Sequence, residues 1–268
     1  MGQYWIVTSP DQRQQISTLA WGKLGEIFPN GNAGRFLEHL LMVPPGKQCL
    51  NEYSKQFDFR LSPNDGNKEE IAKLIKPVLE RLFDNYFGVW ASQKIVCVGD
   101  YAEGQPRALE HIQQPLYDPY ELPEIDPLPL QVDLMRKGLD TQSQRTLEDI
   151  CSQLQANYFP VDQQYVLLNF TTKDYVLDRS YLEIDLPYTD KSSIRGLGDV
   201  VLSQICWTQD PSTSLECSPD LEGAWAGHGF GIVTLSIFDE MTGGREGWKD
   251  VTNERWEELG EIISAEDH

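Results

Sequence analysis

Four ionisable side chains stand where acid–base chemistry could occur: Asp100, His228, Asp239 and Glu240. The three carboxylates follow apolar runs that we expect to be strands, and carboxylates at strand ends can act as general acids or bases or bind hard cations. His228 lies in a glycine-rich turn, and its pKa near neutrality suits proton transfer. These four are the candidate catalytic residues, although solvent-facing carboxylates and a turn histidine without a catalytic role fit the same pattern.

Three aromatic side chains are candidates for ligand binding: Trp90, Trp225 and Tyr101. Each tryptophan follows a glycine by two residues and precedes an apolar run, and Tyr101 directly follows Asp100. Tryptophans in such positions pack between a strand and a helix, with the indole N–H bonded to a carbonyl. The alternative is that the pair lines an apolar pocket at the seam between two halves of the molecule.

Signatures of the common catalytic and cofactor sites are missing from the sequence. There is no G-x-S-x-G elbow, H-E-x-x-H pair, Walker loop or kinase signature. The turn at 227–231 could cradle phosphate, but it precedes a strand and lacks the Walker lysine. The five cysteines are widely spaced without a C-x-x-C pair, which argues against a zinc cluster and a disulfide framework. We expect no metal and no cofactor, and we expect Cys97 to be a small core residue.

Composition indicates a globular protein with a strongly acidic surface. The 268 residues carry 42 acidic and 22 basic side chains, a formal net charge of −20. This charge disfavours nucleic acid and anionic membranes as partners, because lysine and arginine form no basic patch. We find neither a signal peptide nor a run of about 20 apolar residues that could span a membrane. A cytoplasmic location is therefore expected.

Three short blocks recur in the same order, which favours an internal duplication. They are Gln3-Tyr4-Trp5 with Gln164-Tyr165-Val166, Leu24-Gly25-Glu26-Ile27 with Leu197-Gly198-Asp199-Val200, and Gly88-Val89-Trp90-Ala91 with Gly223-Ala224-Trp225-Ala226. The sequence predicts a first copy over residues 1–104, a proline-rich acidic connector over 105–140, and a second copy with an acidic C-terminal helix over 141–268. Prolines keep the connector extended, and its apolar residues indicate that it packs along the surface of the copies. The alternative is that Gly-x-Trp-Ala is a strand-entry pattern used twice.

Apolar spacing predicts helices and strands that alternate along the chain. The expected strands are 4–7, 95–98, 165–170 and 233–237, with a hairpin return from Tyr175, and the expected helices are 36–41, 71–83, 142–158 and the C-terminal segment from Asn253. Helix 71–83 has the clearest apolar face, and Pro77 falls on its polar side. Together these elements predict an α/β or α+β fold with a mixed sheet, packed helices and a pseudo-two-fold axis relating the copies.

Some of these blocks resemble a family of uncharacterised fungal proteins. The matching residues are Met1 to Trp5, Lys23-Leu24-Gly25, Trp90-Ala91, Val98-Gly99-Asp100-Tyr101 and Trp225-Ala226-Gly227. The sequence departs from that family at Ser92 and Lys94, where glycine and arginine are usual. The resemblance implies a cytoplasmic fungal protein and no particular reaction.

Two functions are consistent with these residues. The first is a binding or interaction protein without catalysis, whose site for a small molecule or a protein partner lies at the seam of the two copies. The second is a cofactor-independent lyase, isomerase or hydrolase of specialised metabolism. In that case Asp100, His228, Asp239 and Glu240 would converge in one apolar pocket. Neither nucleic acid nor a membrane is an expected partner.

Overall fold

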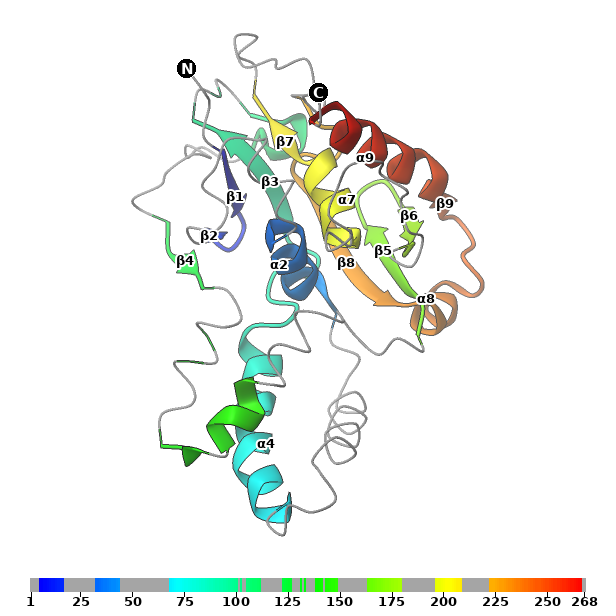
Figure 1. The fold of residues 1–268 in the computed structure, drawn as a ribbon. Coiled ribbons are helices and arrows are strands. Elements are labelled where there is room, and N and C mark those ends of the chain that lie inside the picture. The colour runs from blue at the N-terminus through cyan, green and yellow to red at the C-terminus, as the bar shows by residue number, and fades with distance from the viewer. Residues whose placement is uncertain are drawn as a thin grey trace.

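The computed structural model describes residues 5–16, 32–43, 68–100, 102, 105–111, 122–126, 131, 133, 138–141, 143–148, 163–179, 196–208 and 222–266. Within them the chain forms one mixed sheet with helices packed against it (Figure 1). The expected mixed α/β class is therefore confirmed. Tyr101 and the block at 24–27 lie outside the described residues.

The sheet has nine strands in the described residues. They are β1 (Trp5–Ser9), β2 (Gln14–Ile16), β3 (Lys94–Gly99), β4 (Glu124–Ile125), β5 (Tyr165–Asn169), β6 (Asp174–Leu177), β7 (Cys206–Trp207), β8 (His228–Thr234) and β9 (Lys249–Asp250). Their order is β4-β2-β1-β3-β8-β5-β6-β9, and β7 pairs with β3 outside this path. The strands from β2 to β6 in this order are antiparallel to their neighbours, whereas β4, β7 and β9 each join a neighbour in parallel.

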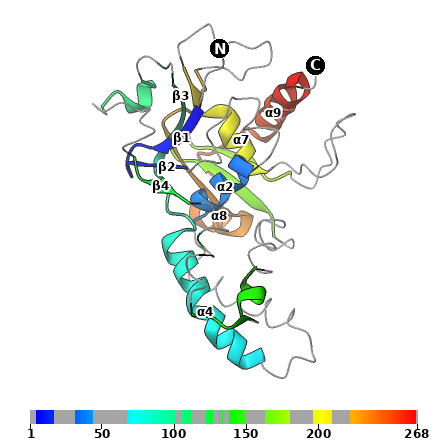
Figure 2. The same ribbon diagram turned by 60° about the vertical axis from the view of Figure 1, so that its left-hand side comes forward.

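Two helices lie side by side over the centre of one sheet face, α2 (Asn32–Leu41) and α7 (Leu197–Gln204) (Figure 1). The C-terminal helix α9 (Thr252–Glu266) packs against α7, and α8 (Leu235–Thr242) directly follows β8. Helix α4 (Lys68–Asn85) projects away from the sheet, as a second view also shows (Figure 2). In the part of the chain that the structure describes, no helix is long and apolar enough to cross a membrane.

Several expected elements are confirmed, with boundaries shifted by a few residues. The hairpin predicted from Tyr165 is β5–β6, the run at 95–98 lies within β3, and the C-terminal helix begins at Thr252. In α4, Ile75, Val78, Leu79 and Leu82 are buried as the spacing predicts. Leu74, which was expected on the same face, is 43% exposed.

The predicted strand at 233–237 is wrong in its second half. β8 ends at Thr234, and α8 begins at Leu235. The side chain of Thr234 accepts a hydrogen bond from the Ile237 N–H at 3.4 Å, which is the geometry of a helix N-cap. The alternation of apolar and hydroxyl residues therefore marks a capped helix start, and Asp239 and Glu240 lie on α8 rather than at a strand end.

Part of the predicted connector joins the sheet as an edge strand. β4 pairs in parallel with β2 at the end of the strand order, and the Gln15 N–H donates to the Pro123 carbonyl at 3.0 Å. Prolines flank β4, and an edge strand tolerates them because one side of it needs no donors. These residues pack on the first part of the chain, as the apolar residues of the connector indicate.

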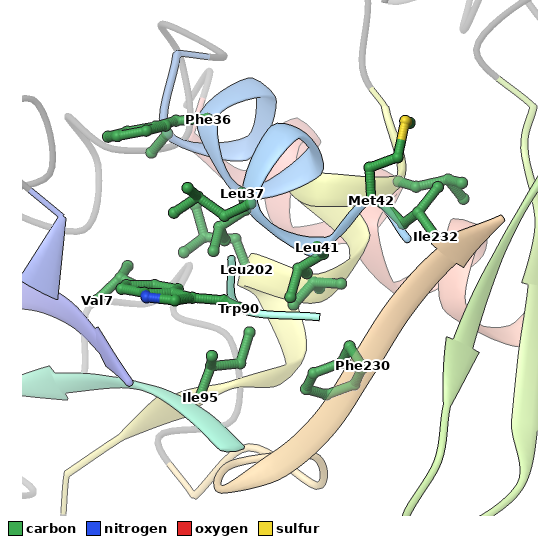
Figure 3. Packing of buried hydrophobic residues seen from close by; sticks show 14 of the residues in the cluster. Val7, Phe36, Leu37, Leu41, Met42, Trp90, Ile95, Leu202, Phe230 and Ile232 are labelled. Carbon is green, nitrogen blue, oxygen red and sulfur yellow. The ribbon is translucent and has the colours of Figure 1, made fainter. Parts of the chain in front are cut away.

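The main core lies between the sheet and the α2–α7 layer. Trp90 lies among side chains from β1, β3, α2 and α7, including Val7, Ile95, Leu37 and Leu202 (Figure 3). A second layer of side chains packs on the opposite sheet face, since neighbouring strand residues point to opposite faces. That layer includes Val96, Val98 and Leu109 near η2 (Arg107–Leu109), and Val166, Leu168 and Phe238 near α8.

Helices α2 and α7 approach each other closely where both carry a glycine. A Cβ added at Gly198 would lie 1.8 Å from the Gly34 carbonyl oxygen, and one added at Gly34 would lie 2.2 Å from Asp199 Oδ1. Backbone atoms cannot move aside as side chains do, so this crossing requires glycine at 198.

Candidate functional site

His228 is the candidate residue with the most specific polar surroundings. It is the first residue of β8, lies opposite Ile95 of β3, and is half-buried. Its Nδ1 atom is 3.0 Å from Asn169 Nδ2 at the end of β5. The histidine therefore lies where β3, from the first part of the chain, is followed in the sheet by β8 and β5, from the second part.

The hydrogen bonds of Asn169 determine which nitrogen of His228 carries the proton. Asn169 Oδ1 accepts hydrogen bonds from the Thr171 and Thr172 N–H groups, at 3.0 and 3.3 Å. The amide nitrogen of Asn169 therefore faces His228 and donates to Nδ1. A neutral imidazole that accepts at Nδ1 carries its proton on Nε2. The ring thus has one N–H donor that the contact with Asn169 does not use.

Burial favours the neutral form of His228. Burial is the main reason that the pKa of His228 is lowered, and the positive charge of Lys94 lowers it further, whereas Asp174 opposes the shift. The Lys94 ammonium is itself held by the Ala108 carbonyl at 2.9 Å, and lies 3.4 Å from His111 Nε2. A neutral imidazole with a fixed tautomer suits hydrogen bonding to a ligand oxygen better than proton donation as a cationic acid.

The three candidate carboxylates have different surroundings. Asp239 accepts a hydrogen bond from the Arg245 Nε at 2.7 Å, and this contact lowers the pKa of Asp239. Glu240 is exposed on α8, and Asp100 directly follows β3. Asp239 is thus held as an ionised partner of Arg245.

Sheet geometry separates the four candidate catalytic residues. Asp100 lies five positions beyond Ile95, the residue opposite His228, which is about 16 Å along a strand. Asp239 and Glu240 lie on α8, which begins after the opposite end of β8 from His228, and Asp239 is bound to Arg245, whose guanidinium carbon lies 5.6 Å from the Tyr175 ring centroid. Because β3 and β8 are antiparallel, Asp100 and the start of α8 lie in opposite directions from His228. The structure does not bring the four together.

The two candidate tryptophans lie inside the main core. Trp90 is 0% exposed and its Nε1 donates to Gln14 Oε1 at 3.1 Å. Trp225 is 2% exposed, and the Arg255 guanidinium carbon lies 4.9 Å from its ring centroid. These surroundings match the packing explanation, in which each indole is covered by neighbouring elements. A role in lining a ligand pocket stays a prediction, as does any role for Tyr101.

Sequence reasoning missed a buried carboxylate between the two central helices. Glu38 of α2 is 6% exposed, and its Oε1 accepts a hydrogen bond from the Gly198 N–H of α7 at 3.0 Å. Burial is the main cause that raises the pKa of Glu38, and the nearby Asp178 and Asp199 add to it. The helical spacing of α2 marks its apolar face but carries no sign that a neighbouring glutamate is enclosed by a second helix.

The role of Asn169 was also missed, although a local signal exists. An asparagine followed closely by threonines is typical of a turn in which the amide oxygen binds backbone N–H groups, as Asn169 does here. Among the described residues, no group of three or more His, Cys, Asp or Glu side chains could hold a metal ion. The chain matches no protein-family model, no curated protein and no solved structure.

Proposed function

We propose that this chain is a binding protein whose small-molecule site lies beside His228, at the seam of two related halves. The observation that carries the proposal is the half-buried imidazole whose Nδ1 is occupied by Asn169 and whose Nε2 carries the proton. Such a donor fits a carbonyl or carboxylate oxygen of a ligand. The distance of Asp100 from this histidine along β3 and the contact of Asp239 with Arg245 favour binding over acid–base catalysis by these residues.

We include a seam between two related halves in this proposal because the two hairpins have matching strand pairing. The paired residues are Thr8 with Gln15 and Ser9 with Gln14 in the first hairpin, and Leu168 with Tyr175 and Asn169 with Asp174 in the second. Each hairpin turn ends in a residue with positive φ, 52° at Arg13 and 59° at Lys173. This agreement supports an internal duplication with a pseudo-two-fold axis.

Hydrogen bonds donated by the residues that lead into β3 and β8 support the same relation. The Ser92 N–H donates to the Phe230 carbonyl at 2.6 Å, and the Gly227 N–H donates to the Ile95 carbonyl at 2.8 Å. Ser92 and Gly227 each follow a Trp-Ala pair and both have positive φ, 65° and 79°. Reciprocal contacts of this kind are expected when two copies of one unit join across a two-fold axis.

The strand registers also refine the sequence blocks. Trp5 and Tyr165 occupy corresponding positions, because they pair with Gly99 and Thr234 at the far ends of β3 and β8. The block match instead aligns Tyr4 with Tyr165, one residue away. In the same way, Gly34 of α2 corresponds to Gly198 of α7 by their shared crossing, which supports a relation that the Leu24–Ile27 block did not suggest.

The site belongs to only one half in this proposal. The positions that correspond to Asn169 and His228 hold Ser9 and Gln93 in the first half. The two turns share a backbone path but carry different side chains. This difference is expected if one half acquired a binding site after the duplication. Gln93 therefore provides a matched control for His228.

The test is thermal unfolding of the purified chain against carboxylates, other metabolites, nucleotides and divalent metals. A compound that binds the native state raises the midpoint by mass action, by roughly 2.7 kcal/mol at a hundred times its dissociation constant. We expect stabilisation by a compound with a carboxylate or carbonyl group. The shift should be lost in His228→Leu and kept in Gln93→Leu.

Two results would contradict the proposal. A panel without any shift would argue for a protein partner instead of a small molecule. A ligand that stabilises His228→Leu as strongly as the unmodified chain would assign the site to another part of the molecule.

A further inference from the structure

Two buried cysteines lie side by side on neighbouring strands. Cys97 of β3 and Cys206 of β7 are register partners in a parallel pairing, and both are 0% exposed free thiols. Neighbouring strands lie about 4.8 Å apart, which is within the range of about 4.4–6.8 Å that Cα atoms span in disulfides. Both side chains belong to the main core cluster.

The two thiols influence each other. The neighbouring Cys206 is the main cause that raises the pKa of Cys97, and burial adds to it. Cys206 Sγ lies 3.5 Å from the Leu202 carbonyl oxygen, to which its own thiol donates. As register partners, the two side chains lie on the same face of the sheet, one on each of two neighbouring strands.

The fold does not require thiols at this pairing. On the other side of the seam, Met42 and Ile232 form a parallel bridge, and the Val43 N–H donates to the Ile232 carbonyl at 2.8 Å. The Cys97 N–H likewise donates to the Ile205 carbonyl at 2.9 Å. Ordinary apolar side chains thus fill the corresponding pair, so the adjacent thiols are a property of one half.

We propose that Cys97 and Cys206 form a thiol oxidation site, which a peroxide converts into an intramolecular disulfide. One thiolate attacks an oxygen of the peroxide, the O–O bond breaks, and hydroxide is released. The attacking sulfur becomes a sulfenic acid. The other thiolate attacks that sulfur, the S–S bond forms, and a second hydroxide leaves. The two thiol protons convert both hydroxides to water, so hydrogen peroxide is reduced while the dithiol is oxidised.

Access to the buried sulfurs depends on local opening of β7. This strand has only two residues, and short peripheral strands open more readily than the centre of a sheet. Oxidation should therefore be slow at low temperature and accelerate under mild destabilisation. The disulfide would join two strands that are about 110 residues apart in the chain, a long loop of the kind that gains most from closure.

The test is oxidation of the folded full-length chain with hydrogen peroxide, followed by alkylation in denaturant and non-reducing peptide mapping. We expect a mass loss of about 2 Da per disulfide, because two hydrogens are removed, and a peptide pair that joins Cys97 to Cys206. The oxidised chain should unfold at a temperature roughly 5 °C or more above the reduced chain. Dithiothreitol should reverse both changes.

Controls distinguish this pair from the other cysteines. Cys97→Val keeps an apolar side chain in β3 and should abolish the 2 Da loss, whereas Cys151→Ser should not. Recovery of Cys97 and Cys206 as alkylated thiols after prolonged oxidation would overturn the proposal. Linkage of either residue to Cys49, Cys151 or Cys217 in the folded chain would overturn it as well. Because the mapping uses the unmodified chain, it does not depend on any variant folding.

Discussion

The hairpin turns β1–β2 and β5–β6 make the same backbone path but carry different side chains. In each turn the side chain of the second residue accepts from a backbone N–H of a strand in the same part of the chain: Asp11 accepts from the Lys94 N–H of β3 at 3.0 Å, and Thr171 accepts from the Gly229 N–H of β8 at 3.2 Å. Only the second turn adds an asparagine that binds a histidine. The shared backbone path of the turns is therefore separate from the side chains of the candidate site, so changes to the fold and to the candidate site should have different effects.

The largest expected effect is loss of a core tryptophan from either half. Trp90→Ala and Trp225→Ala should each lower the free energy of unfolding by about 3–5 kcal/mol, because each removes a fully buried side chain and leaves a cavity. Urea unfolding measures this. Trp248→Ala, at a half-buried residue outside the seam, should cost less. A loss below about 1 kcal/mol at Trp90 or Trp225 would contradict their burial in the main core, since surface substitutions usually change stability by about 0.5 kcal/mol or less.

The helix crossing provides a smaller and more local test. Gly198→Ala should destabilise the chain by about 1–3 kcal/mol or more through overpacking, because the new Cβ would meet the Gly34 carbonyl at 1.8 Å. Gly260→Ala in α9 is the matched control, since a Cβ there meets nothing within 4 Å. The control should be neutral or stabilising by up to about 1 kcal/mol. Equal effects at both glycines would contradict the close crossing.

Buried Glu38 makes the free energy of unfolding depend on pH in a defined direction. Because its pKa is raised in the folded chain, the folded state keeps a proton that the unfolded state releases. Stability should therefore fall as the pH rises from the unfolded value, about 4.5, through the raised pKa. Glu38→Gln keeps an acceptor for the Gly198 N–H and cannot ionise. Chemical unfolding measured across pH should give a flatter profile for the variant in this window; an unchanged profile would argue against the enclosed carboxyl.

His228 should produce the smallest effect, with the opposite sign. Its pKa is lowered in the folded chain, so the unfolded state binds a proton first as the pH falls. Stability from this group is complete above the unfolded value, about 6.5, and declines as the pH drops toward the lowered pKa. His228→Gln should remove this decline, and Gln93→Leu should leave it. Thermal midpoints between pH 5 and 8 provide the measurement.

Many of the helices and strands were predictable from local sequence patterns. The apolar spacing of α4, the hairpin at β5–β6 and the strand at β3 follow from periods of 3.6 and 2 residues. The strand predicted at 233–237 failed because Thr234 and Ser236 alternate with apolar residues, while the hydroxyl of Thr234 in fact caps α8. A capping contact and a strand face give the same residue pattern over so short a segment.

The site was predictable only in part. The sequence marks His228 as a candidate because a titratable side chain in a glycine-rich turn is unusual, but its partner Asn169 lies 59 residues away in the sequence. Asp239 and Glu240 follow an apolar run, yet that run is the start of a helix at Leu235 and not the end of a strand. Contacts that depend on strand order, such as those of Glu38 and the Cys97–Cys206 pair, leave no local pattern.

The most direct test of a binding site at His228 is a nitrogen-15 NMR measurement of the histidine rings in the folded chain, with and without a stabilising carboxylate. We expect His228 to be neutral at pH 7, with an unprotonated Nδ1 and a protonated Nε2. The Nε2–H resonance should shift when the ligand binds, and that of exposed His111 should not. A proton on Nδ1, or a ligand that stabilises the chain without changing the His228 signals, would contradict a binding site at this residue.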